Sequence, residues 1–380
     1  MTRDHLLFFG DSSKVNAVYN RDLNEFVQNT ERKQNMEGFD PDYLDFVDYI
    51  TKMTHRIWEE KGIGYIYKSF HHGVTMHHGS TSTKGIAAIV ARNLQTLHAF
   101  PDRRLIGENV IWSGNDKEGF YSSHRMLSTA TNLGESSFGP ATYRKVTYMS
   151  IVDTFVFANR IVEGWQIRDN LHLVRQLGLD PHELAKKMAP VVKSTEQKHF
   201  GLPETLEGQF EPPVYKPVHE EFEIGDFILS MYNTIWEWKF FNRIGEFYAK
   251  NAVVHFICDQ HLTGYDQIQG LWISLFASLP NAAFVIERVT CNQRGGDDDW
   301  DVAVRWRWQG LHEGYGYFGK PSGNPVDIMG ISNLRVIAGK IAEEWLLIDG
   351  LDVLKQIYTR YEQTRSQAEE LNPAREQCAD

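Results

Sequence analysis

The sequence predicts an α+β chain that contains one cone-shaped domain twice, with the two copies packed against each other. Three observations support this prediction: the length of the chain, an internal repeat, and the order of helices and strands within each copy. A chain of 380 residues exceeds what one hydrophobic core usually organises, so two domains are expected. An aromatic content of 13% is typical of interiors that are built from large rings.

The internal repeat is clearest near the end of each copy. The segment RIVEGWQIRD at 160–169 aligns with KIAEEWLLID at 340–349, at an offset of 180 residues (345 − 165 = 180). Further upstream Trp58 aligns with Trp236, at an offset of 178 (236 − 58 = 178). A register that shifts by only two residues over the whole unit indicates a true repeat with small loop insertions.

Each copy begins with helices and ends with strands. Apolar residues recur at helical spacing over 45–62 and 226–242, and a second helix is predicted after Gly85 and after Gly264. Strand patterns occupy 74–78, 108–112, 119–131, 142–158 and 161–168 in the first copy, and 253–257, 284–290, 300–312, 325–337 and 341–348 in the second. Consecutive strands with short turns pair with each other, so we expect antiparallel sheets in an α+β fold.

The repeat divides the chain into five parts. They are an N-terminal extension (1–44), the first domain (45–180), a proline-rich linker (181–222), the second domain (223–358) and a C-terminal tail (359–380). Prolines and charged residues dominate the linker, which predicts a stiff segment able to lie across one domain.

Charge and cysteine content exclude several classes of function. A net charge of −11 without a basic stripe argues against nucleic acid and anionic membranes as partners. The three cysteines form no C-x-x-C pair, so neither a disulfide framework nor a cysteine-based zinc site is indicated. No apolar stretch is long enough to span a bilayer, and we expect a cytoplasmic protein.

The second copy offers a candidate acid–base pair. Strand alternation places Trp306, Trp308 and His312 on one face, and the final strand places Trp345 and Asp349 on a common face. If that second face is concave, burial raises the pKa of Asp349, which could act as a general base while His312 polarises a substrate oxygen. Asp349 could equally cap the helix that follows it.

These residues resemble the SnoaL-like polyketide cyclase family of the nuclear-transport-factor-2-like superfamily. The resemblance covers most of residues 226–357 and rests on GLHEG at 310–314, FGKP at 318–321, GKIAEEW at 339–345, Asp349 and LKQ at 354–356. It implies a curved antiparallel sheet that helices close into a deep cone. It also implies cofactor-free acid–base catalysis by Asp349 and His312, as in a cyclase, isomerase or lyase acting on a small, partly apolar, carbonyl-bearing substrate.

The first copy resembles the same family over residues 45–180 but differs at one important position. It retains Asp169, which we predict to be catalytic, whereas Asn132 stands where the offset of 180 places His312. An amide can hydrogen-bond an oxyanion but cannot shuttle a proton at neutral pH. We therefore expect the second copy to carry the chemistry, with Asn132 contacting substrate in the first.

Histidines gather at 71–78 in the first copy. Neighbouring residues of a strand point to opposite faces, so we expect no metal there. His77 and its repeat partner His255 are predicted to line the cavities. His77, His78 or His124 could replace the missing histidine of the first copy. The other predicted substrate contacts are tryptophans: Trp165, Trp306, Trp308 and Trp345.

A non-catalytic small-molecule-binding or scaffold protein of the same fold is the alternative function, because the superfamily includes non-catalytic members. Domains of this superfamily commonly pair through their sheets. We therefore expect an intrachain pseudo-dimer with a small-molecule ligand, and the sequence leaves open whether whole chains associate further.

Overall fold

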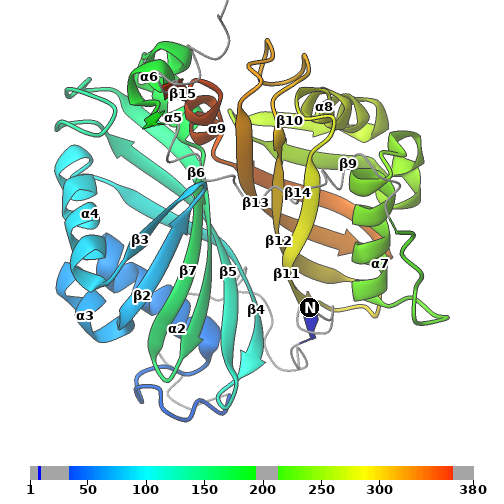
Figure 1. The fold of residues 1–380 in the computed structure, drawn as a ribbon. Coiled ribbons are helices and arrows are strands. Elements are labelled where there is room, and N and C mark those ends of the chain that lie inside the picture. The colour runs from blue at the N-terminus through cyan, green and yellow to red at the C-terminus, as the bar shows by residue number, and fades with distance from the viewer. Residues whose placement is uncertain (1–6, 10–33, 194–212, 363–380) are drawn as a thin grey trace, which may run out of the picture.

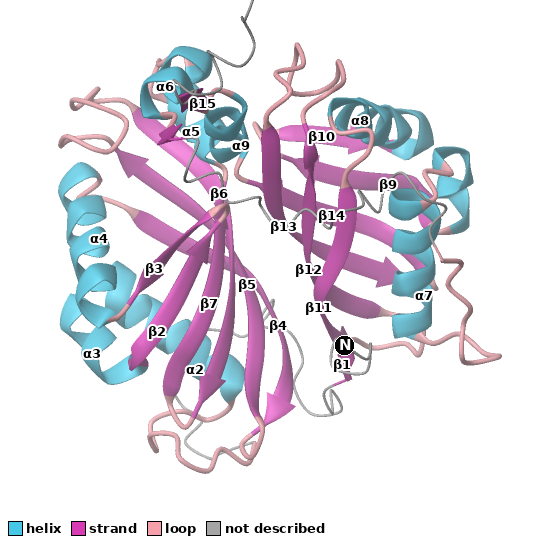
Figure 2. Cartoon of the chain, in the orientation of Figure 1, coloured by secondary structure: helices cyan, strands magenta, loops and turns pink. Residues whose placement is uncertain are grey.

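The computed structural model describes residues 7–9, 34–193 and 213–362, which form two α+β domains with their sheets facing each other (Figure 1). Helices cover the outer side of each sheet, as Figure 2 shows. The predicted fold class is therefore confirmed. No helix in the described ranges has the length and apolar character needed to cross a membrane.

The first domain places its helices before its long strands. Its early elements are α2 (Phe46–Thr54), a π-helical segment (His55–Glu59), a 3-10 turn (Ile63–Tyr65), α3 (Ile66–Ser69), β2 (Phe70–His78), β3 (Thr81–Lys84) and α4 (Ile86–Ala99). Its later strands are β4 (Arg104–Asn115), β5 (Gly119–Thr131), β6 (Lys145–Phe157) and β7 (Arg160–Arg168). Asp45 begins α2, because its carboxylate accepts a hydrogen bond from the backbone N–H of Asp48.

The second domain repeats this order. Its elements are α7 (Ile224–Met231), a π-helical segment (Tyr232–Glu237), a 3-10 segment (Phe241–Glu246), β9 (Tyr248–Phe256), β10 (Gln260–Thr263), α8 (Gly264–Ser278), β11 (Ala283–Gln293), β12 (Trp300–Leu311), β13 (Pro325–Ile337) and β14 (Lys340–Ile348). The sheet orders are β3-β2-β7-β6-β5-β4 and β10-β9-β14-β13-β12-β11, so the two domains share one topology. From the N-terminal extension, β1 (Leu7–Phe9) adds a parallel strand beside β11.

Part of the predicted linker is regular structure. After α5 (Asn170–Gln176), the chain forms α6 (Pro181–Met188), which packs on α9 (Gly350–Ile357) of the second domain, and β8 (Val191–Lys193), which pairs with β15 (Arg360–Glu362). Proline at the first position of α6 costs no hydrogen bond, so this proline marks a helix start instead of a linker. The rest of the linker before residue 213, and the tail beyond 362, lie outside the described residues.

The two sheets meet through buried arginines that stack on tryptophans. Arg305 of the second domain lies 3.2 Å from the Asp153 carboxylate, and its guanidinium carbon lies 3.6 Å from the Trp165 ring centroid. In the reciprocal contact Arg125 of the first domain lies 3.4 Å from the Trp345 ring centroid. The predicted intrachain packing of the two domains is thus present, and it buries one face of each sheet.

Candidate functional site

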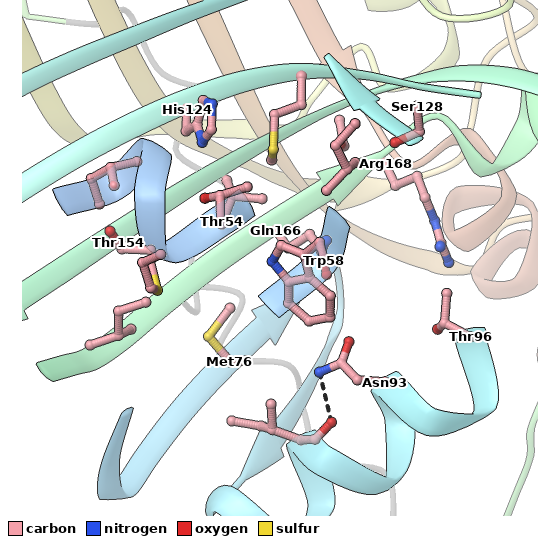
Figure 3. Close-up of a pocket in the computed structure, with 18 of the residues that line it drawn as sticks. Thr54, Trp58, Met76, Asn93, Thr96, His124, Ser128, Thr154, Gln166 and Arg168 are labelled. Carbon is pink, nitrogen blue, oxygen red and sulfur yellow. Dashed lines mark hydrogen bonds between the residues drawn. The ribbon is translucent and has the colours of Figure 1, made fainter. Parts of the chain in front are cut away.

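The first domain encloses a cavity of about 130 Å³ inside its cone (Figure 3). The interior faces of β5, β6 and β7 form one wall, and residues of α2 and α4 form another. A cavity of about 150 Å³ can hold a benzene molecule, so this space suits a small ligand. Much of its lining is apolar: Ile50, Met53, Phe70, Met76, Ile89, Leu105, Met126, Val152 and Ile161.

His124 lies in the wall of this cavity on β5. Only 5% of the residue is exposed, and burial lowers its pKa to about 4, so the imidazole is neutral at physiological pH. Its Nε2 atom is buried without a hydrogen-bond partner among the described residues. A Cβ atom on Gly107 would lie 3.0 Å from this nitrogen, so the glycine leaves room for the ring. The His124 ring thus borders the cavity, and one of its nitrogens has no hydrogen-bond partner among the described residues.

A second imidazole, His78, lies where the cavity meets a larger cleft of about 820 Å³. Burial lowers its pKa to about 3, and the charges of Arg92 and Arg168 act in the same direction. Its Nε2 atom is also buried without a partner among the described residues. His78, Arg92, Thr96 and Arg168 line both spaces and thus form the junction between them.

The charged side chains that line the cavity itself are all arginines, and the Asp349 carboxylate of the adjoining cleft acts on one of them, Arg92. Three arginines contribute to its lining, Arg92, Arg103 and Arg168, whereas no Asp or Glu does. Arg168 donates through Nε to Asn170 Oδ1 at 2.7 Å, and the guanidinium of Arg103 lies 5.3 Å from the Trp58 ring centroid. In the part of the chain that the structure describes, no carboxylate lies within 4.0 Å of these three arginines.

Asp349 lies at the domain interface and borders the larger cleft, which residues of both domains line. Its carboxylate caps α9 by accepting from the Asp352 N–H, and it also accepts from the Asn170 side chain of the first domain. Burial, with the nearby Asp352 carboxylate, raises the pKa of Asp349. The predicted common face of Trp345 and Asp349 is thus the face that packs on the first domain, not the concave interior. The capping alternative describes its observed contact.

Asn132 and His312 each fasten the loop that follows their strand. Asn132 Oδ1 accepts from the Thr142 N–H at 2.8 Å, and the amide donates to the Gly134 carbonyl at 2.8 Å. His312 Nδ1 accepts from the Ser322 N–H at 3.3 Å. Among the described residues no hydrogen bond joins His312 to Asp349, so their catalytic pairing stays a prediction. Asn132 and His312 thus make the same kind of loop contact, and the Nε2 atom of His312 is buried without a hydrogen-bond partner among the described residues.

Asp169 is the counterpart of Asp349 and has the corresponding contacts. It caps α5 by accepting from the His172 N–H at 2.9 Å, and it accepts from the Cys258 N–H of the second domain at 2.6 Å. Burial raises its pKa to about 6. Asp169 is not among the residues that line the first-domain cavity. Its catalytic role therefore stays a prediction, and its observed contacts join the two domains.

The interior of the second cone is packed with aromatic rings. Trp236 lies 4.8 Å from Trp306, 5.2 Å from Trp272 and 6.3 Å from Trp308, measured between ring centroids. Trp306 and Trp308 are 1% and 2% exposed, so the structure places both predicted substrate contacts in a filled core.

The difference between the two interiors is visible in the repeat. Polar residues of the first cavity align with larger or apolar residues of the second domain: Thr54/Tyr232, His78/Phe256, Asn93/Trp272, His124/Val304, Ser128/Trp308 and Arg168/Ile348. This exchange of residues along the interior faces is the signal that locates the cavity. It is missed when the copies are compared only at the positions of the family's catalytic pair.

The remaining predicted contacts lie on the interface side of the sheets. His77 stacks on Trp165 with ring centroids 5.4 Å apart, and His255 stacks on Trp345 at 4.9 Å. The two tryptophans are covered by arginines of the opposite domain. His77 and Trp165 lie on the face of their strands that is opposite to the first-domain cavity, because alternate residues of a strand face opposite ways. His255 and Trp345 belong to the second domain. Among the described residues, the histidines at 71–78 are not part of any group of three close metal-ligating side chains.

Each domain is thus a curved sheet that helices close into a cone, and the first cone contains a small cavity. Residues 227–357 match the model of the SnoaL-like polyketide cyclase family, which confirms the resemblance predicted for the second domain.

Solved structures also match this chain, each over a segment about as long as one domain. A protein from Jannaschia sp. CCS1 assigned to the SnoaL-like polyketide cyclases is 21% identical, with a TM-score of 0.32, over 37% of this chain and 98% of its own. A protein from Acidithiobacillus ferrooxidans assigned as a polyketide cyclase is 22% identical, with a TM-score of 0.30, over 34% of this chain and 92% of its own. No curated protein matches the chain.

Proposed function

We propose that this chain is a cofactor-independent acid–base enzyme whose reactive pocket lies in the first domain. It would cyclise, isomerise, dehydrate or hydrate a small, partly apolar, carbonyl-bearing substrate. The observation that carries this proposal is His124, a neutral imidazole whose buried Nε2 atom has no partner among the described residues and which lines the first-domain cavity.

His124 is the proton carrier in this proposal. A neutral imidazole can take a proton from a substrate carbon or hydroxyl group through Nε2. The resulting imidazolium is unfavourable, because the site is buried and the cavity lining carries arginines and no carboxylate. The proton therefore returns readily to the substrate at another atom. Such a return is what isomerisation, dehydration and ring closure require.

The developing substrate oxyanion is stabilised by groups of the same cavity. The hydroxyl of Tyr148 and the Nε atom of Arg103 are buried without hydrogen-bond partners among the described residues, and both side chains line the cavity. Donors that are fixed in a site with little water stabilise a forming negative charge more strongly than water does. Tyr148 and Arg103 are thus the proposed oxyanion donors, and the filled second domain serves as a scaffold.

Deuterium exchange tests this function even while the natural substrate is unidentified. The full-length protein is incubated in D2O with a panel of small unsaturated ketones and β-ketoesters, and deuterium incorporation is followed by NMR. We expect exchange that His124→Asn abolishes and that His312→Asn retains. Loss of exchange in His312→Asn but not in His124→Asn would assign the chemistry to the second cone instead.

A non-catalytic binding protein is the second candidate. It is favoured by one observation, the absence of any carboxylate general base from the cavity lining. Saturable binding of panel compounds without deuterium incorporation, at any pH between 5 and 9, would support this function and contradict the catalytic one.

A further inference from the structure

The cavity of the first domain has a charge asymmetry that a neutral ligand does not explain. Arg92, Arg103 and Arg168 line it, no acidic side chain does, and none of the three has a carboxylate within 4.0 Å among the described residues. Arg103 and Arg168 are partly buried, and such arginines usually have an anionic partner, because their desolvation is otherwise uncompensated. Arg92 is exposed, and the carboxylate that acts on its charge is that of Asp349. The partner of Arg168 is therefore expected to arrive with the ligand.

Two of these arginines are positioned at the entrance. Arg92 and Arg168 line both the cavity and the outer cleft, together with Thr96 and His78. Arg168 is held by the hydrogen bond from its Nε atom to Asn170, which leaves its two terminal nitrogens for other acceptors. In Figure 3 Arg168 and Thr96 lie at one end of the view, and His124 lies at the other. An anion at the entrance would thus leave the rest of the ligand beside His124.

The outer cleft limits how much negative charge the ligand can carry. Its charged side chains balance: Arg92, Arg168 and Lys355 are cationic, and Glu135, Asp349 and Asp352 are acidic. Polyanions such as phosphate esters would meet the acidic groups, whereas one planar carboxylate matches the fork of an arginine. The inner cavity, at about 130 Å³, has room for an apolar body close to the size of one benzene ring.

We propose that the first-domain pocket binds a small monocarboxylate. Its carboxylate lies between Arg92 and Arg168 at the entrance, and its apolar, ring-sized body fills the cavity beside His124. This inference rests on the proposed function and narrows its substrate class to carbonyl compounds that also carry a free carboxylate. The carboxylate orients the ligand, so the proton is transferred at an atom on the apolar body.

Isothermal titration calorimetry of the full-length protein at pH 7.5 tests this inference with a matched pair of probes. Phenylacetate has the proposed charge and size, and phenylacetamide has nearly the same shape without the charge. We expect phenylacetate to bind at least tenfold more tightly than phenylacetamide. Phenyl phosphate, a dianion, should bind more weakly than phenylacetate. Equal affinity for acid and amide, no binding of either, or tighter binding of the phosphate would overturn the inference.

Variants identify the residues responsible. Arg92→Met and Arg168→Met should each weaken phenylacetate binding at least tenfold and leave phenylacetamide unchanged. Arg243→Met is the control, since it removes an exposed arginine that pairs with Glu246 in the second domain, and it should change neither affinity. Ser128→Trp, which introduces the residue aligned in the filled cone, should abolish binding of both probes. An unchanged preference for the acid in both entrance variants would contradict the assignment.

The two proposals fail in different ways. Deuterium exchange into neutral ketones that depends on His124, without any preference for carboxylates, would refute the carboxylate site and leave the acid–base function standing. Carboxylate binding that depends on Arg92 and Arg168, without exchange into any panel compound, would refute the enzyme and retain the binding site.

Discussion

The buried neutral state of His124 predicts a measurable pH dependence of stability. An unfolded histidine binds a proton near pH 6.5, whereas folded His124 binds one only near pH 4. Between these values the unfolded chain holds more protons than the folded one, so the free energy of unfolding falls as the pH decreases. A difference of 2.5 pKa units corresponds to about 3 kcal/mol of stability, which is retained above pH 7 and lost in full below pH 4.

The substitution His124→Asn isolates this contribution. Asn has similar size and polarity and does not titrate. Asp169 and Asp349 have raised pKa values and act in the opposite direction, since the folded protein gains stability as they protonate, but they are common to both proteins and cancel in the difference. We expect wild type, relative to His124→Asn, to lose about 3 kcal/mol between pH 7.5 and pH 4.

Urea unfolding followed by circular dichroism, at half-unit pH steps, measures this difference. An imidazole NMR titration of the folded protein provides an independent check, since the His124 resonance should move near pH 4. Parallel stability curves for the two proteins, or a midpoint near 6.5, would show that His124 is solvated and charged. The proposed proton carrier would then lack the enclosed environment on which its role depends.

Three further predictions concern the second domain and its interface. Trp308→Ser should lower the free energy of unfolding by about 3–5 kcal/mol, because it opens a hole in packed rings, and a loss below 1 kcal/mol in urea unfolding would mean that this interior is already loose. Asp349→Asn should raise the melting temperature at pH 7.5 but not at pH 4. Asn also caps helices, and a buried carboxylate destabilises the folded protein only when it is ionised. A lower melting temperature of the variant at pH 7.5 would contradict this prediction. Chains cut by a protease site placed within 194–212 should elute as one species in gel filtration, held by contacts such as Arg305 with Asp153, whereas two separate species would refute a stable interface.

The sequence predicted the repeated fold closely because its signals are local. The strand expected at 119–131 coincides with β5, and the one expected at 325–337 coincides with β13. Glycine at the start of the second helix of each copy and proline after its end also placed α4 and α8 correctly. These signals depend only on neighbours along the chain and not on how the elements pack.

The site could not be predicted as well, because strand alternation separates two faces without saying which is inside. In β12 eight of the twelve residues are buried, since one face packs in the cone and the other packs against the first domain. The strand pattern alone is equally consistent with Trp345 and Asp349 pointing into the cone. Only the position of the opposite domain shows that they lie at the interface. The location of the cavity depends on side-chain volume across several strands and helices. The aligned pair Ser128 and Trp308 indicates a difference in side-chain volume between the two cones. This signal is recognised only when all interior positions of the two copies are compared.

The contrast between an open and a filled cone has a consequence for how such a chain can change over generations. In a dimer of identical subunits, one mutation alters both interiors at once, so a tryptophan that strengthens one cone also closes the other. Joining the copies in one gene removes that constraint. Ser128 and Trp308 could then diverge independently, with one cone supplying rigidity and the other retaining the unpartnered polar groups that a reactive pocket needs.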